Sequence, residues 1–163
     1  MAQGFERLTI FCRDYDRSLA FYRDLLGLVA VEEKVIEGAA AGGLLRLPPC
    51  RIRIALLAPS ENAPPILGLF EIGGVALDSL APPQGRPAHG QSALVLRTSA
   101  FDTVRQRLES AGVRFLTPPL VYPKRQASAV SPAGLYHEMI FYDPDVVLVS
   151  VMQIDLLPEE AQP

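Results

Sequence analysis

The chain has 163 residues, of which 49% are hydrophobic and 20% charged, and its formal net charge at pH 7 is −3. This is enough apolar material for one domain, or for two small halves that share a core. The slightly acidic balance argues against nucleic acid as the main partner, because phosphate binding requires a basic face. Two isolated cysteines favour a reducing compartment, and no apolar run approaches the ~18 residues of a membrane span. We therefore expect a cytoplasmic protein with no nucleic-acid or membrane partner.

The first half of the chain opens with a strand and an amphipathic helix. Apolar and polar residues alternate over 7–13, which is typical of a half-buried strand. Asp14 is a suitable N-cap residue, and an apolar stripe at helical spacing follows it. Gly27 ends the helix as a left-handed cap residue does.

Three further strands complete this half. They are predicted at Val29–Glu37 and in a hairpin formed by Leu44–Leu47 and Arg51–Leu57. Residues 5–58 therefore form a βαβββ module. Residues 59–90 are rich in proline and glycine, and we interpret them as a connector in which one apolar run, Ile66–Ile72, allows an added strand.

The same order of elements returns over residues 91–154, which form a second βαβββ module. It opens with a strand at Ala93–Thr98 and continues with a helix. A long segment, Thr117–Leu135, contains four prolines and a Lys-Arg pair and is predicted to be a loop, either functional or disordered. A hairpin around Asp143-Pro144-Asp145 closes the module, and residues 155–163 are predicted to be a frayed tail.

The two predicted helices differ by one residue. When Asp14 is aligned with Ala100, the second helix is one residue shorter before its terminal Gly112. Ser99 and Asp102 resemble a capping box in which Asp replaces the usual Glu. We therefore expect a side-chain cap at the start of the second helix.

Three motifs occur in the order and spacing of one known family. They are DYDRSLAFYRDLLGL in the first module, FDTVRQRLESAG in the second and FYDPD before the last strand. On these motifs the sequence resembles the vicinal oxygen chelate superfamily, which contains glyoxalase I, extradiol dioxygenases, fosfomycin-resistance enzymes and bleomycin-resistance proteins. The resemblance implies an α+β fold, in which two βαβββ modules form a cup-shaped mixed sheet with helices on the outside, and a homodimer. Val146 stands where the family generally has glycine, and we expect another turn geometry there because valine disfavours positive φ.

The resemblance also assigns positions to metal ligands, which are usually His and Glu on the first and last strands of each module. In this sequence these positions hold Arg7, Ala55, Ala93 (or Ser92, if the register slips by one) and Ser150. Arginine is permanently cationic, alanine has no donor atom and neutral serine is a poor ligand. We therefore predict no metal or other cofactor.

Strand alternation directs a mixed apolar and cationic set of side chains toward the cup. Arginines there would hold a carboxylate, phosphate or phenolate through forked hydrogen bonds. The predicted ligand-binding residues are Arg7, Thr9, Phe11, Arg53, Arg97, Ser150 and Met152, together with Tyr122 or Lys124 from the loop 117–135 acting as a lid. Two of the arginines have a structural alternative: Arg97 would point from a strand end into solvent, and Arg53 would pair with Glu71 or Glu138.

Candidate catalytic residues are Arg7 as an electrophile and Glu138 or His137 as an acid–base group. His137 and Glu138 are adjacent on a strand, so they face opposite sides, and the sequence does not decide which of them faces the cup. A displaced metal site would use His89, His137, Glu71 and Glu138.

Three functions follow from these residues. The leading prediction is a metal-free small-molecule binding protein of the bleomycin-resistance kind, with an aromatic or anionic ligand in the cup. The second is an enzyme of the same superfamily, lyase, isomerase or dioxygenase-like, that is metal-independent or uses the displaced site. The third is a catalytically empty dimeric interaction module. Turnover with a proton-transfer residue of shifted pKa would favour the enzyme.

Overall fold

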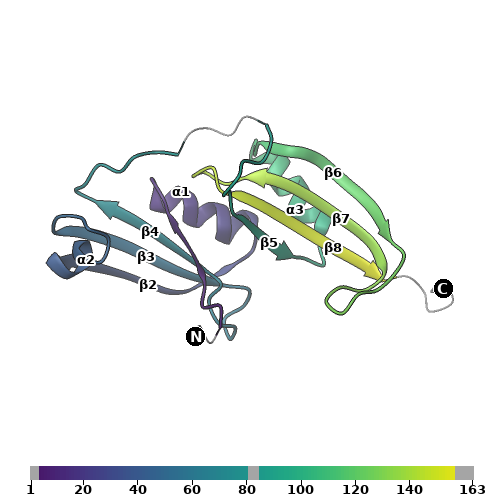
Figure 1. Cartoon of the computed structure of the whole chain (residues 1–163), viewed down its shortest axis with the longest axis horizontal. Coiled ribbons are helices and arrows are strands. Elements are labelled where there is room, and N and C mark those ends of the chain that lie inside the picture. The colour runs from purple at the N-terminus through teal and green to yellow at the C-terminus, as the bar shows by residue number, and fades with distance from the viewer. Residues whose placement is uncertain (1–3, 81–84, 157–163) are drawn as a thin grey trace. The chain divides into compact units, whose positions relative to one another are not determined.

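The computed structural model describes residues 4–80 and 85–156. The chain divides into two compact units, Met1–Pro82 and Pro83–Pro163, each with its own sheet (Figure 1). Residues 81–84 of the predicted connector and residues 157–163 of the predicted tail lie outside the described residues.

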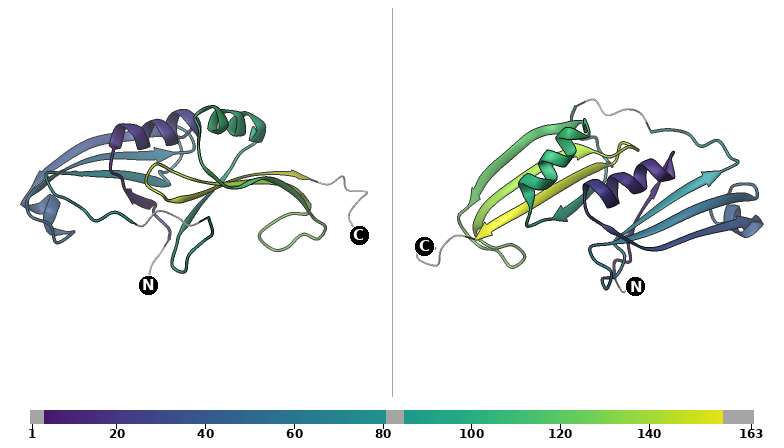
Figure 2. Two further views of the ribbon diagram at one scale, coloured as in Figure 1. Left: turned by 90° about the horizontal axis from the view of Figure 1, so that it is seen from above. Right: turned by 180° about the vertical axis from the view of Figure 1, so that it is seen from behind.

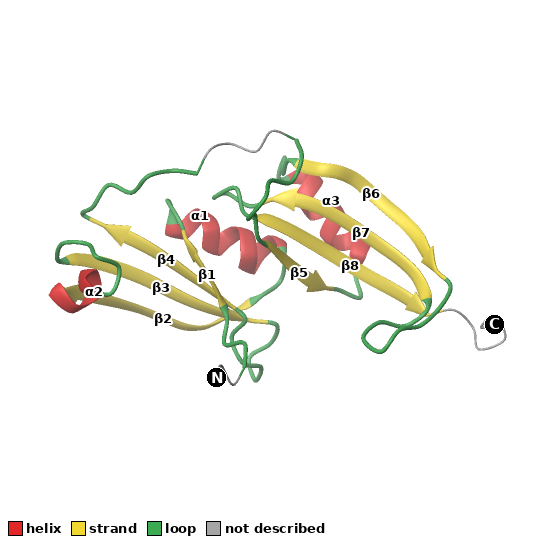
Figure 3. Cartoon of the chain, viewed as in Figure 1, coloured by secondary structure: helices red, strands yellow, loops and turns green. Residues whose placement is uncertain are grey.

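The first unit is built on a four-stranded sheet (Figure 3). Its elements are β1 (Leu8–Phe11), α1 (Tyr15–Ala20), the π-helical turn η1 (Phe21–Leu25), β2 (Val29–Gly38), α2 (Ala39–Gly43), β3 (Cys50–Ala58) and β4 (Leu67–Gly73). The strand order is β1-β4-β3-β2, with β1 parallel to β4 and the other pairs antiparallel.

The second unit repeats this arrangement without the short extra helix. Its elements are β5 (Ala93–Arg97), α3 (Phe101–Ser110), β6 (Phe115–Lys124), β7 (Gly134–Tyr142) and β8 (Leu148–Leu156). The strand order is β5-β8-β7-β6, and β5 is parallel to β8. Each unit is therefore a βαβββ module, and the predicted α+β fold class is confirmed.

In each unit the main helix lies against one face of its own sheet (Figure 2). Tyr22 and Leu108 are fully buried on the two helices, and the sheet residues that share these cores include Leu57, Leu69, Phe141 and Val149. Burying a large apolar side chain stabilises a fold by about 1.5–3 kcal/mol, so these contacts fix each helix on its sheet. Within the described residues, no helix has the length and apolar character that crossing a membrane requires.

The last two strands of the first unit differ from the prediction. Leu44–Leu47 is a turn after α2, not a strand, and the last strand of the unit is β4. Its residues lie in the predicted connector 59–90 and match the apolar run Ile66–Ile72, for which an added strand was allowed. The proline-rich flanks of β4 resemble a linker, but pairing with β1 and β3 supplies ladder hydrogen bonds on both of its edges.

The extra residue of the first helix is accommodated by a π-helical turn. The backbone N–H of Leu26 donates to the carbonyl oxygen of Phe21, five residues back, at 3.2 Å. Asp14 is the N-cap and its carboxylate accepts from the N–H of Arg17 at 3.0 Å, as predicted. Gly27 has φ of +80°, which confirms the left-handed cap. A single inserted residue therefore widens one turn while both helix ends keep their positions.

The predicted capping box of the second helix is wrong. The N-cap residue is Ala100, and its side chain makes no capping hydrogen bond. The free N–H of Phe101 instead donates to Oε1 of Gln153, on β8, at 3.1 Å. A side chain distant in sequence thus supplies the cap that the local pattern assigned to Ser99 and Asp102.

The predicted loop Thr117–Leu135 is strand over its first part. Residues up to Lys124 belong to β6, which pairs with β7 through two register shifts. Because β6 is an edge strand, its prolines interrupt no central ladder. Lys124 holds the remaining loop: its ammonium donates to the Ser128 hydroxyl at 3.1 Å and to the Ser131 carbonyl oxygen at 3.0 Å. A lid spanning the whole predicted loop is therefore ruled out.

The turn between β7 and β8 keeps the left-handed geometry despite its valine. Val146 has φ of +64°, so the expectation of another turn geometry is wrong. The reason is the buried Asp143, whose Oδ1 accepts from the N–H groups of Asp145 at 2.9 Å and Val147 at 2.7 Å. The surrounding bonds therefore force the valine into a costly conformation.

We expect Val146→Gly to stabilise the protein. Relief of the left-handed strain contributes about 1–2 kcal/mol, and the greater freedom of glycine in the unfolded chain offsets part of it, leaving about 1 kcal/mol. Chemical denaturation of the two proteins measures this difference. Val130→Gly, in an exposed loop, is the control. If glycine at position 146 lowers stability as the control does, the conformation of Val146 is not strained.

Candidate functional site

Each sheet has a distal face, which we define as the face turned away from α1 in the first unit and from α3 in the second. Alternation along the strands separates the residues of the two faces. In the first unit the distal face carries Arg7, Thr9 and Phe11, with Gly68 opposite Thr9. A cluster of buried apolar residues on the same face packs beneath α2 and includes Ile52 and Ile54.

Arg7 is the most unusual side chain of this face. An added Cβ on Gly68 would lie 2.8 Å from Cε2 of Phe70 and 3.3 Å from Nε of Arg7, so the arginine lies across the glycine. The Arg7 Nε is buried and has no hydrogen-bond partner among the described residues. The Phe11 ring is 47% exposed and meets Phe70 edge to face, with centroids 6.2 Å apart. The structure thus brings Arg7, Thr9 and Phe11 together, as predicted.

The predicted metal-ligand position on the last strand of the first module was assigned to the wrong residue. In the second unit Val95 pairs with Ser150, and in the first unit Thr9 pairs with Gly68. Gly68, not Ala55, is therefore the counterpart of Ser150. Ala55 is fully buried on a strand that is third in the chain order of its module. The error follows from taking β3 as the last strand.

Arg53 faces α1, not the distal face, and the prediction that it points into the cup is wrong. Its guanidinium donates to Asp16 at 2.8 and 3.2 Å, lies 4.0 Å from the centroid of the Tyr15 ring and is 3.6 Å from Glu71. The hydrogen bond to Arg53 lowers the pKa of Asp16. The alternative, in which Arg53 pairs with Glu71, is thus observed, and Arg53 fastens the start of α1 to the sheet.

Tyr15 completes this fastening. Its hydroxyl donates to Glu33 at 2.6 Å and its backbone N–H donates to Glu71 at 3.0 Å. Burial, followed by the hydrogen bond to Glu33, raises the pKa of Tyr15. Glu71 is therefore engaged in a structural contact on the helix-facing side.

We expect Arg53→Met to destabilise the protein by about 1 kcal/mol, because it removes a cation–π contact and partly exposed ion pairs. Arg51→Met is the matched control: that arginine pairs with Glu37 at 3.1 Å in an exposed position, and its loss should change stability by less than about 0.5 kcal/mol. Thermal unfolding of both variants gives the comparison, and equal effects would show that Arg53 holds nothing in place.

In the second unit, a carboxylate and two hydroxyls meet on the distal face. Glu138 accepts a hydrogen bond from Ser150 Oγ at 2.6 Å on Oε1 and from the Tyr122 hydroxyl at 2.7 Å on Oε2. The hydrogen bond to Glu138, followed by burial, raises the pKa of Tyr122 to about 12. The Tyr122 ring stacks on Tyr136, with centroids 5.6 Å apart. Met152 lies directly opposite Glu138 on the neighbouring strand.

His137 faces the other side of the second sheet, which settles the choice that the sequence left open. Its Nε2 lies 2.8 Å from a carboxylate oxygen of Asp155, and its ring centroid is 5.7 Å from that of Phe101 on α3. His137 and Glu138 therefore do not share a site. Within residues 4–80 and 85–156, no three His, Cys, Asp or Glu side chains lie close enough to hold a metal, so the displaced site with Glu71 and His89 is not formed there.

Ala93 and Arg97 lie on β5, where both are exposed. Arg97 pairs in register with Met152 and thus shares its face. It makes no ion pair among the described residues. Arg97 thus lies exposed at a strand end, as the alternative of a solvent-facing side chain predicted. In this position it is also available to a ligand.

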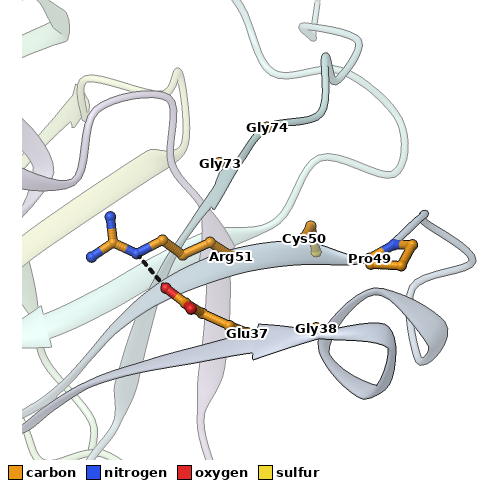
Figure 4. A pocket seen from close by; sticks show the side chains of 7 residues that line it. All are labelled: Glu37, Gly38, Pro49, Cys50, Arg51, Gly73 and Gly74. Atoms are coloured by element: carbon orange, nitrogen blue, oxygen red, sulfur yellow. Dashed lines mark ion pairs between the residues drawn. The ribbon is translucent and has the colours of Figure 1, made fainter.

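An open hollow of about 560 Å³ lies elsewhere, at the end of the first sheet (Figure 4). Its lining residues are Glu37, Gly38, Pro49, Cys50, Arg51, Gly73 and Gly74. The charged side chains in it, Glu37 and Arg51, are paired with each other, as the dashed line in Figure 4 shows. None of the predicted site residues lines this hollow, and its charges are already satisfied.

A family model described as the Glyoxalase/Bleomycin resistance protein/Dioxygenase superfamily matches residues 4–151. The chain belongs to this superfamily, as its motifs indicated. No curated protein matches the chain.

Solved structures with the same fold cover almost the whole chain. A glyoxalase family protein from Bacillus cereus is 15% identical, with a TM-score of 0.73 over 94% of this chain and 95% of its own. The trypanothione-dependent glyoxalase I of Leishmania major is 13% identical, with a TM-score of 0.60 over 93% and 87%. A fosfomycin resistance protein from Listeria monocytogenes is 16% identical, with a TM-score of 0.52 over 100% of both chains. At these identities the similarity shows a shared fold.

Proposed function

We propose that this chain is a small-molecule binding member of the superfamily that works without a metal and holds an aromatic anion through Arg7. The observation that carries the proposal is the buried Nε of Arg7, which has no hydrogen-bond partner in the described part of the chain and lies at a metal-ligand position. The other such positions hold Gly68, Ala93 and Ser150, which offer no side chain, a methyl group and a hydroxyl. This donor set does not fit a divalent cation.

A guanidinium at this position attracts what a metal attracts, namely an anionic oxygen. A buried N–H without an acceptor costs about 1–3 kcal/mol, and a ligand carboxylate would remove that cost. The carboxylate geometry matches the fork of a guanidinium, so two parallel hydrogen bonds are available.

The neighbouring aromatic rings support an apolar body on the ligand. Phe11 is half exposed and is held edge to face against Phe70. A flat ring placed beside Phe11 would bury apolar surface while its carboxylate reaches Arg7. Thr9 lies between them on the strand and offers one further hydroxyl.

Titration of labelled protein with benzoate and with its neutral isostere benzamide, followed by NMR, tests the proposal. We expect benzoate to shift the amide signals of Arg7, Thr9 and Phe11 and to bind at least about tenfold more tightly than benzamide, equivalent to about 1.4 kcal/mol. Equal binding of the two probes, or shifts confined to other segments, would overturn the assignment.

A second candidate function is a metal-independent enzyme that uses Glu138 for proton transfer. It is favoured by the 2.6 Å hydrogen bond that Ser150 donates to Glu138. This bond holds the carboxylate beside Ser150, the residue at the metal-ligand position on β8. A general base must lie within hydrogen-bond distance of the substrate proton that it removes. Exchange of the α-protons of 2-hydroxyacetophenone in D₂O, with Glu138→Gln as control, distinguishes this enzyme from a binding protein, which would leave the exchange rate at its uncatalysed value.

A further inference from the structure

The distal face of the second sheet carries two opposite charges that are not paired with each other. Glu138 accepts from two hydroxyl groups, but no cation contacts it within the described parts of the chain. Arg97 likewise makes no ion pair there. Two hydroxyl donors satisfy one lone pair on each carboxylate oxygen and leave the negative charge without a counter-ion.

The two charged residues flank Met152 in one row across the sheet. Arg97 pairs with Met152 in the parallel ladder, and Met152 pairs with Glu138 in the antiparallel ladder. Backbones two strands apart lie about 10 Å from each other, so a direct ion pair would require both side chains to bend toward Met152. The gap is instead lined by a thioether, which adapts to flat apolar groups.

The residues around Glu138 hold its carboxylate in place. Tyr122 and Ser150 bind one oxygen each, and Ser150 is only 3% exposed. Tyr136 is buried, stacks on Tyr122 and donates through its hydroxyl to the Pro132 carbonyl oxygen at 2.8 Å, so the ring pair is fixed from behind. The raised pKa of Tyr122 keeps this hydroxyl a donor toward Glu138. Such a fixed carboxylate beside aromatic rings suits a protonated amine.

We propose that this face binds a small amphoteric molecule, with its protonated amine on Glu138, its carboxylate on Arg97 and a flat apolar body over Met152. A simple cation would be repelled by Arg97, and a simple anion would be repelled by Glu138. A ligand that carries both charges at opposite ends satisfies both residues. The site uses residues of the second unit alone and is independent of the proposed role of Arg7.

The test uses three matched probes: 4-(aminomethyl)benzoate, benzylamine and benzoate. Each is titrated into labelled full-length protein, and the amide signals of Arg97, Glu138 and Met152 are followed by NMR. We expect the amphoteric probe to bind this face at least about tenfold more tightly than either singly charged probe. The amide signals of residues 7–11 are followed separately. If benzoate does not bind at Arg7, the result for the second sheet is therefore unaffected.

Two variants that each remove one charge assign the charges. Glu138→Gln should lower the affinity for 4-(aminomethyl)benzoate at least about tenfold, and Arg97→Gln should do the same. Glu109→Gln, an exposed carboxylate on α3, is the control and should leave the affinity unchanged. Absence of second-sheet shifts with the amphoteric probe, equal affinities for the three probes, or a Glu138→Gln protein that binds as the parent does would each overturn the proposal.

Discussion

Replacing Asp143 by alanine is expected to lower the free energy of unfolding by roughly 3 kcal/mol, because two hydrogen bonds to a buried carboxylate are lost at once. The Asp143 side chain is the acceptor that holds the N–H groups of Asp145 and Val147. Without it, the strained φ of Val146 also loses its support. For a chain of this size the melting temperature should fall by about 2–4 °C for each kcal/mol.

Three variants separate the role of Asp143 from a general effect of removing charge. Asp78→Ala removes an exposed carboxylate and should change stability by less than about 0.5 kcal/mol. Asp143→Asn keeps one acceptor oxygen and should cost less than the alanine variant. In the double variant Asp143→Ala/Val146→Gly, the glycine should recover part of the loss. An alanine variant as stable as the parent would show that the turn is held by its backbone bonds alone.

Replacing Arg7 by methionine is expected to abolish binding of an aromatic carboxylate and, at the same time, to stabilise the unliganded protein. Loss of a charged hydrogen-bonding partner typically costs 2–5 kcal/mol in binding, which is about 30-fold or more. Methionine reaches only to the position of the arginine Nε and buries no unsatisfied N–H, so the free energy of unfolding should rise by about 1 kcal/mol. Benzoate titration and chemical denaturation of the same preparation give the two values.

The opposite signs of these two effects distinguish a binding residue from a structural one. If Arg7 held the fold together, methionine would lower stability. Arg7→Lys keeps the charge but loses the forked donor geometry, so it should bind benzoate with intermediate affinity. Arg17→Met, on the exposed side of α1, is the control for a loss of one positive charge and should change neither value.

The sequence predicted those parts of the fold that local pattern determines. Asp14 and Gly27 bound the first helix as expected, because an N-cap carboxylate and a left-handed glycine act within a few residues of the backbone that they serve. The one-residue difference between the helices was also visible in the sequence. Its consequence, the π-helical turn at Phe21–Leu25, was not, since an inserted residue can also be absorbed in a loop.

The errors arose where contacts distant in sequence decide the structure. Gln153 caps α3 from another element, and no local pattern contains that information. The sequence allowed a strand at Ile66–Ile72, which matches β4, but its proline-rich flanks assigned that strand to the connector and not to the first module. This concealed Gly68 as the counterpart of Ser150. Arg53 was placed on the wrong face because alternation gives the spacing of side chains along a strand but does not say which face the helix covers.

The candidate site was predicted in part. Arg7, Thr9 and Phe11 share the distal face of the first sheet, as strand alternation indicated. The sequence named Glu138 as a candidate and left its orientation open, and its bonds to Ser150 and Tyr122 supply that orientation. Tyr122 was expected on a flexible lid but lies on β6, where the edge position tolerates the prolines that suggested a loop.

The metal content of protein purified without chelator is the most direct test of a metal-free binding site built around Arg7. Elemental analysis by mass spectrometry should find no first-row transition metal near one equivalent per chain, including after incubation with zinc, nickel, manganese or iron(II) and removal of excess by gel filtration. One equivalent of retained metal that competes with benzoate for the distal face of the first sheet would contradict the proposed role of Arg7.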